Sequence, residues 1–253
     1  MKTTIKFFSL LLSFVVLAAC QQARKPKLTE ITCQVIPVDT SWNALVDPEM
    51  KQAVDFYKIQ LDSVMNRVIG HAPQSLYKGK PQSLLSNFTA DILVQAGREL
   101  GRKPVQFALM NNGGLRAGIN EGPVTVGNIF QVFPFENELV LLQLKGSDVK
   151  ELFKRLAAIG GEGLAGTELR VRNNEVEQLL LDSKPVEDDQ LYWMATIDYL
   201  ADGNSGMGVL TKATERVNVG VRLRDVMLRY VEDLTKSGKP VSAQLDNRIL
   251  INP

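Results

Sequence analysis

The spacing of apolar residues predicts a chain of mixed helices and strands. After the helix-start signature Asp47-Pro48-Glu49, apolar residues recur at three-and-four spacing from Ala53 to Val68, as on one face of an amphipathic helix. Similar patterns mark further helices at about 83–100, 147–157 and 221–234, and strands at about 105–110, 139–144, 168–172, 178–181 and 191–197. Because helices and strands do not alternate regularly, we expect an α+β fold: a single domain with a mixed β-sheet packed by helices.

The amino terminus has the pattern of a secretory signal. Lys2 and Lys6 precede a mostly apolar run at 7–19, which has about two-thirds of the length needed to cross a bilayer as a helix. The run ends in Leu17-Ala18-Ala19-Cys20, which resembles the lipobox of bacterial lipoproteins. We expect a signal peptide at 1–19 and lipidation of Cys20; a plain secretory peptide with an incidental cysteine is the alternative.

The segment that follows has the composition of a tether. Residues 20–48 are polar, aperiodic and interrupted by prolines, with one short strand predicted at 32–38, and the folded domain is expected at 49–253. Acyl chains on Cys20 would hold that domain on a membrane without a spanning helix. Gln21 is not the aspartate that often retains lipoproteins in an inner membrane. We therefore expect a lipid-anchored protein of the bacterial cell envelope, at the outer membrane and facing the periplasm.

Charge and histidine content exclude two classes of function. The 29 Lys and Arg residues nearly balance the 28 Asp and Glu residues, so no electrostatic footprint for nucleic acid is present. His71 is the only histidine among 253 residues, and it cannot supply the several imidazoles that dimetal or His-rich zinc centres use. We expect no metal or cofactor in this chain, and no nucleic-acid partner.

A glycine-rich segment follows the predicted strand at 105–110. Gly113 and Gly114 let backbone N–H groups approach a ligand closely, and Arg116 offers a planar fork of donors that matches phosphate oxygens. This combination is typical of an anion-recognition loop. A hairpin turn followed by a solvated arginine is the alternative.

Aromatic residues stand at the ends of two further segments. Phe133-Pro134-Phe135-Glu136-Asn137 precedes one predicted strand, and Tyr199 follows another, just before the polar, glycine-punctuated loop at 202–206. Two aromatic faces can clamp a base, each stack contributing about 1–3 kcal/mol. The alternative is that these rings are core residues at strand ends.

The order of these motifs resembles the C-terminal, substrate-specificity domain of the 5′-nucleotidases and UDP-sugar hydrolases, from about residue 50 to the end. The matching segments are 86–91 for G-N-L-I-A-D, 111–116 for N-G-G-G-I-R, 123–127 for the following strand and turn, 134–137 for P-F-x-N, 144–147 for L-x-G-S, and 192–201 for Y-x-V-A-T-x-D-F-L-A.

The resemblance implies a nucleotide site without catalytic residues. The rings of Phe135 and Tyr199 would sandwich the nucleobase. Asn111 and Asn137 would hydrogen-bond the base. The remaining implied contacts are Arg116 to phosphate, Gly113 and Gly114 through their backbone, and Gly166 at the pocket wall.

The sequence departs from the family pattern at three places. Pro81-Gln82 stands where the family has an arginine, and Asn112 replaces the first glycine of the triplet. Ser205 stands where an aspartate would bind ribose hydroxyls, and serine lacks the charge and the second oxygen. We expect a changed affinity or ligand choice.

In the family a separate metallophosphoesterase domain cuts the phosphate ester, with two metals on motifs such as D-x-H, G-D and G-N-H-E. No such set of motifs occurs in the sequence. We hypothesise the specificity subunit of a split 5′-nucleotidase, which works with a metallophosphoesterase on another chain that would hold the divalent metals. A membrane-tethered nucleotide-binding protein without catalysis and a degenerate scaffold are the alternatives.

Overall fold

The computed structural model describes residues 30–40 and 47–252. The expected signal peptide and Cys20 lie outside these residues. The chain divides into two units, Met1–Gln52 and Ala53–Pro253. None of the described helices is long and apolar enough to cross a membrane.

The strand predicted at 32–38 is wrong. This segment is exposed and belongs to none of the sheets of the described chain. Alternating apolar residues favour a strand, but an extended segment becomes a strand only when a neighbour pairs with its backbone.

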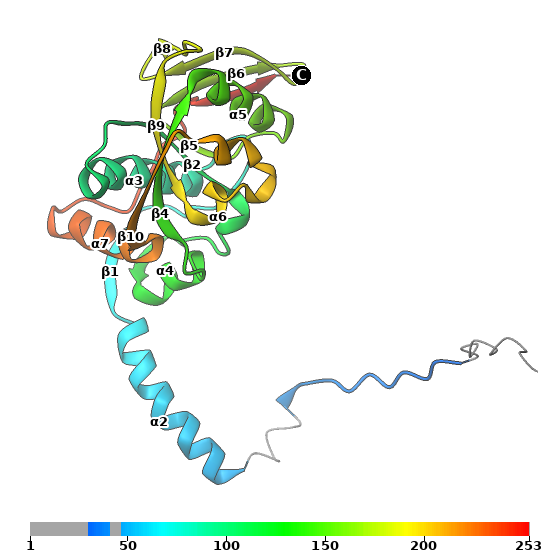
Figure 1. The fold of residues 1–253 in the computed structure, drawn as a ribbon. Coiled ribbons are helices and arrows are strands. Elements are labelled where there is room, and N and C mark those ends of the chain that lie inside the picture. Colours follow the sequence, from blue (N-terminus) through cyan, green and yellow to red (C-terminus); the bar gives the residue numbers. More distant parts are fainter. Residues whose placement is uncertain (1–29, 41–46, 253) are drawn as a thin grey trace, which may run out of the picture. The chain divides into compact units, whose positions relative to one another are not determined.

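A five-stranded mixed sheet forms the centre of the second unit (Figure 1). The strand order is β10-β4-β9-β2-β5; β2 and β9 are parallel, and the other neighbouring pairs are antiparallel. The strands are β2 (Val105–Met110), β4 (Glu138–Lys145), β5 (Gly163–Ala165), β9 (Leu191–Ile197) and β10 (Glu215–Arg222). The predicted α+β fold with a mixed sheet is confirmed.

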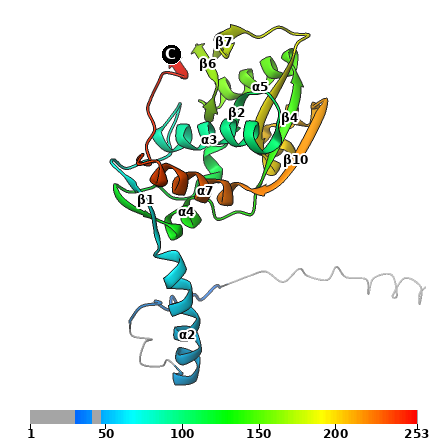
Figure 2. The ribbon, with the colours of Figure 1, turned by 90° about the vertical axis from the view of Figure 1, so that its left-hand side faces the viewer.

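Helices cover this sheet. Helix α3 (Leu84–Gly101) packs against β2, β4, β5 and β9, and α7 (Leu223–Lys236) runs beside α3 (Figure 2). Helix α5 (Gly146–Ala158) packs against β4 and β9. Phe107 of β2 and Phe153 of α5 are fully buried, with ring centroids 5.8 Å apart. These contacts bury the apolar faces that the sequence pattern predicted.

Smaller elements complete the fold. A second sheet has the order β11-β6-β7-β8, and β1 pairs with β3. Their bounds are β1 (Val68–Ala72), β3 (Gly122–Thr125), β6 (Thr167–Arg172), β7 (Glu175–Leu181), β8 (Lys184–Pro185) and β11 (Ile249–Asn252). The short helices are η2 (Asn112–Gly114), α4 (Val126–Val132), α6 (Asp198–Ala201), η3 (Asn204–Gly206) and η4 (Gly208–Lys212).

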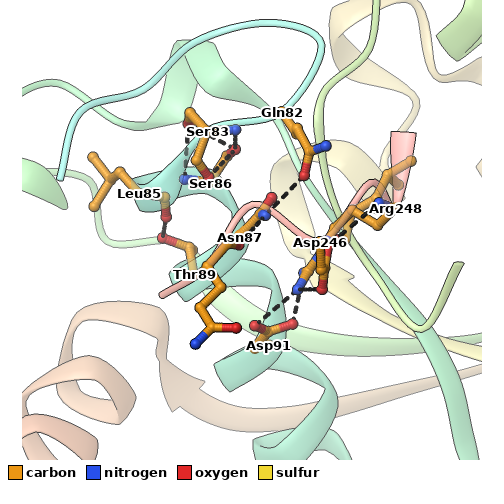
Figure 3. A network of polar contacts seen from close by, with 11 residues as sticks. Gln82, Ser83, Leu85, Ser86, Asn87, Thr89, Asp91, Asp246 and Arg248 are labelled. Carbon is orange, nitrogen blue, oxygen red and sulfur yellow. Dashed lines mark hydrogen bonds and ion pairs between the residues drawn. The ribbon is translucent and has the colours of Figure 1, made fainter. Parts of the chain in front are cut away.

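The start of α3 anchors the C-terminal segment (Figure 3). The Asn87 amide donates hydrogen bonds to Gln82 Oε1 (3.1 Å) and to the carbonyl oxygen of Gln244 (2.8 Å). Four residues along the helix, Asp91 accepts a 2.7 Å bond from Arg248. The 86–91 motif therefore has a structural role here: it joins α3 to the segment before β11.

Helix α2 (Pro48–Met65) forms where the periodicity predicts it but ends before Val68, which the pattern assigned to the helix and which instead begins β1. None of the residues of α2 is buried. Val54, Tyr57 and Leu61 on its apolar face are 54%, 70% and 55% exposed. Periodicity specifies that a helix has an apolar face, but it does not specify what covers that face.

Candidate functional site

Seven of the eight predicted binding residues line one cavity of about 460 Å³. They come from three separate stretches of the sequence, which the fold brings to the same place. The lining residues are Asn111, Gly113, Gly114, Arg116, Phe135, Asn137, Tyr199 and, in addition, Ser205.

Gly166 is not brought together with the others. It lies between β5 and β6 and lines a different cavity of about 280 Å³, with Thr167 and Arg248 among its neighbours. Its φ is +72°, and a Cβ atom would lie 2.0 Å from the carbonyl oxygen of Gln106. The positive φ and the close approach to β2 therefore both require glycine at the turn between β5 and β6.

The glycine-rich loop begins where β2 ends, and two charged side chains from other segments bind its backbone. The backbone N–H of Asn112 donates to Glu162 Oε2 (2.5 Å), and Lys78 Nζ donates to the carbonyl oxygen of Leu115 (2.6 Å). At Gly114 a Cβ atom would lie 2.6 Å from Met110 Cε, so a larger residue would displace the Met110 side chain. Glu162 and Lys78 stand outside the recognised motifs, and no signal in the sequence pointed to them.

The aromatic residues separate into core and surface. Phe133 is buried, whereas Phe135 is 47% exposed and Tyr199 is 43% exposed. Both exposed rings line the cavity. The alternative of core residues at strand ends therefore holds for Phe133 but not for Phe135 or Tyr199.

Asn111 places a buried polar group at the cavity. The residue is only 6% exposed, and its Oδ1 has no hydrogen-bond partner within the described part of the chain. A buried carbonyl oxygen without a partner costs about 1–3 kcal/mol, which a ligand donor would recover. This matches the base-binding role that the family resemblance implies.

The loop after α6 closes the side of the cavity next to Tyr199. Gly203, Ser205 and Gly206 all have positive φ, at 86°, 57° and 75°. Ser205 is the non-glycine among them, and it lines the cavity. Its hydroxyl stands at the place where the resemblance puts a ribose-binding aspartate, so this wall carries a neutral group.

The lining residues combine aromatic faces, neutral amides and one cation. The Arg116 guanidinium carbon lies 5.8 Å from the centre of the Phe135 ring, and Arg116 Nη1 donates a weak 3.4 Å bond to the Gly113 carbonyl oxygen. Arg116 has no ion-pair partner among the described residues, so its positive charge is available to an anion. Such a lining suits a ligand with an aromatic ring and an anionic group.

Over 30–40 and 47–252, no group of three or more His, Cys, Asp or Glu side chains is placed to hold a metal ion.

Residues 68–212 match the protein family described as 5′-nucleotidase, C-terminal domain. The chain belongs to this family. The matched range contains all the residues that line the cavity. The resemblance inferred from the motifs is thereby confirmed.

Known relatives of this 5′-nucleotidase C-terminal domain are longer proteins. The chain is 28% identical over 236 residues to the trifunctional nucleotide phosphoesterase protein YfkN of Bacillus subtilis, covering 85% of this chain and 16% of the relative. It is also 28% identical over 207 residues to the protein UshA of Yersinia enterocolitica, covering 79% of this chain and 36% of UshA.

Among solved structures, the 5′-nucleotidase precursor of Thermus thermophilus superposes with a TM-score of 0.69 at 27% identity. The match covers 79% of this chain and 42% of that one. The chain thus spans less than half the length of each of these three proteins.

Proposed function

We propose that this domain binds a nucleotide or nucleoside in the cavity lined by Phe135 and Tyr199. The observation that carries the proposal is that two half-exposed rings from distant segments line one cavity together with Asn111. A base between the two rings would gain about 1–3 kcal/mol from each stack. The unpartnered Asn111 Oδ1 would accept a hydrogen bond from the base.

The phosphate end of the ligand is assigned to the glycine-rich loop. Arg116 supplies the positive charge. The Gly114 N–H already donates to the Asn111 carbonyl oxygen (3.0 Å), whereas no acceptor is seen for the Gly113 N–H among the described residues, so Gly113 is assigned the backbone contact to phosphate. A guanidinium recognises phosphate oxygens through two parallel hydrogen bonds, which neutral side chains cannot supply.

We further propose that the domain acts as the specificity subunit of a split 5′-nucleotidase. It would present the bound nucleotide to a metallophosphoesterase on another chain, which would hold the divalent metals. The name of YfkN, a nucleotide phosphoesterase, supports a role in phosphate ester hydrolysis. A lipid on Cys20 would place the domain at the outer membrane, facing the periplasm.

Isothermal titration calorimetry with AMP and adenosine tests the binding proposal. We expect saturable binding of AMP; a purified, folded chain that binds neither compound would overturn it. Mixing the chain with secreted metallophosphoesterases tests the split enzyme, because a true partner should gain AMP hydrolysis or form a complex. Tight AMP binding with no gain from any partner would favour a stand-alone binding protein instead.

The anchor has its own test. Metabolic labelling with a fatty acid in a bacterial host should mark the wild-type protein and not the Cys20→Ser variant. Equal labelling of both proteins, or of neither, would contradict the lipoprotein proposal.

A further inference from the structure

Two of the cavity residues lie on a segment that has no regular structure of its own. Residues 133–137, here called the strap, connect α4 to β4 and carry Phe135 and Asn137. Within the strap no helix or strand fixes the backbone, so its position depends on contacts with other elements. These contacts come from the end of β10 and the start of α7, about 90 residues further along the chain.

Arg224, at the start of α7, grips the strap through several hydrogen bonds. Its Nη1 donates to the carbonyl oxygens of Phe133 (3.3 Å) and Pro134 (3.4 Å), and its Nη2 donates to Glu136 Oε1. The Arg224 side chain is only 7% exposed, and its guanidinium carbon lies 4.2 Å from the centre of the Phe130 ring. One planar guanidinium thus holds two carbonyls and a carboxylate of the same segment.

The residues next to Arg224 hold the rest of the strap. Leu223 donates its backbone N–H to the carbonyl oxygen of Asn137 (2.8 Å), and Arg222 Nε lies 2.7 Å from Glu136 Oε2. The hydrogen bond from Arg224 and the charges of both arginines lower the pKa of Glu136. The backbone or side chain of every strap residue except Phe135 is therefore bound to residues 222–224.

A buried guanidinium is costly unless each donor has a partner, and Arg224 Nε has none in the described structure. An apolar side chain of similar size would fill the same space without this cost. Stability alone therefore accounts poorly for an arginine at this position. Holding several acceptors of the strap in one orientation, in contrast, requires N–H donors at fixed relative positions, which a planar guanidinium supplies.

We propose that Arg224 is a positioning residue for base recognition: it holds the strap so that the Phe135 ring faces the cavity. This inference rests on the proposed nucleotide-binding function. Arg224 does not line the cavity itself and acts through Phe135.

A double-mutant cycle with AMP as the probe tests this coupling. Arg224→Met should weaken AMP binding about tenfold, and the double variant Arg224→Met/Phe135→Ala should bind no more weakly than Phe135→Ala alone. Arg229→Met, five residues along the same helix and exposed, should bind AMP like the wild type. Additive losses in the double variant, or wild-type affinity in Arg224→Met, would overturn the proposal.

Two exposed or conservative changes cover the case in which Arg224→Met does not fold. Glu136→Gln removes the carboxylate charge that pairs with Arg224, and Arg224→Lys keeps the positive charge but loses the planar guanidinium with its several N–H donors. Both variants should unfold cooperatively and bind AMP less tightly than the wild type. In a Phe135→Ala background neither change should lower AMP affinity further. Wild-type AMP affinity in both variants overturns the inference. A wild-type chain that binds no AMP would instead defeat the proposed function, so the two failures are distinguishable.

Discussion

The side-chain amide of Asn204 donates a 2.9 Å hydrogen bond to the carbonyl oxygen of Tyr199. This bond joins the loop that carries Ser205 to α6, which carries the Tyr199 ring. Asn204→Ala should therefore weaken AMP binding by about 0.5–1.5 kcal/mol, because both groups become less fixed.

Calorimetry on Asn204→Ala measures this effect, with Thr211→Ala as a control in the neighbouring η4, where the hydroxyl bonds only the local Gly208 carbonyl. An equal loss of affinity in both variants would mean that the whole loop region, and not this bond, determines binding.

The two cavity rings should contribute to affinity and not to stability. Phe135→Ala and Tyr199→Ala should each lower AMP affinity by about 1–3 kcal/mol and leave the melting temperature nearly unchanged, because both rings are half exposed. Phe133→Ala, two positions away and buried, should instead cost about 3–5 kcal/mol of folding stability. Thermal unfolding and calorimetry on the three variants separate the effects; unchanged affinity in both cavity variants contradicts the base clamp.

Arg116 should discriminate between a nucleotide and a nucleoside. Arg116→Met should reduce AMP affinity by about 1.5–3 kcal/mol, the contribution of a hydrogen bond to a charged group, and affect adenosine much less. Titrations with both ligands give the ratio of AMP to adenosine affinity for each variant. The AMP affinity of the wild type should also fall as the salt concentration is raised. If adenosine and AMP lose affinity equally, Arg116 acts through the adjacent Phe135 ring and not on phosphate.

The local ion pair between Asp246 and Arg248 in the C-terminal segment predicts a pH effect on stability. The hydrogen bond from Arg248 lowers the pKa of Asp246, so its carboxylate stabilises the fold above its ordinary pKa, and this contribution is lost as the pH falls. Asp246→Asn should therefore melt below the wild type at pH 7, and the difference should shrink below about pH 4.

Differential scanning calorimetry between pH 3 and pH 8 follows this difference. Asp189→Asn, an exposed change for which no hydrogen bond or ion pair is seen in the described structure, serves as the control. A melting difference for Asp246→Asn that stays constant down to pH 3 would assign the effect to packing and not to the carboxylate charge.

Local periodicity was enough to predict most elements of the sheet and its helices. The strand expected at 139–144 is β4 (Glu138–Lys145), and the helix expected at 147–157 is α5 (Gly146–Ala158). The helix predicted from 221 begins at Leu223, because Val221 and Arg222 end a strand, β10, that the pattern did not predict. The residues of β10 are exposed or half-buried, so the apolar pattern of this strand is weak. Pairing with β4 decides the conformation of β10.

The sequence by itself determined the fold class, the family and seven of the residues that line the cavity, because each motif is a local pattern of residue types. Only the tertiary structure decided that Phe133 is core while Phe135 faces the cavity, and that Gly166 packs against β2 instead of joining the site. It also showed that Arg224 holds the strap. Such outcomes depend on contacts between residues about 60 to 90 positions apart, and a local pattern carries no information about which distant segments will meet.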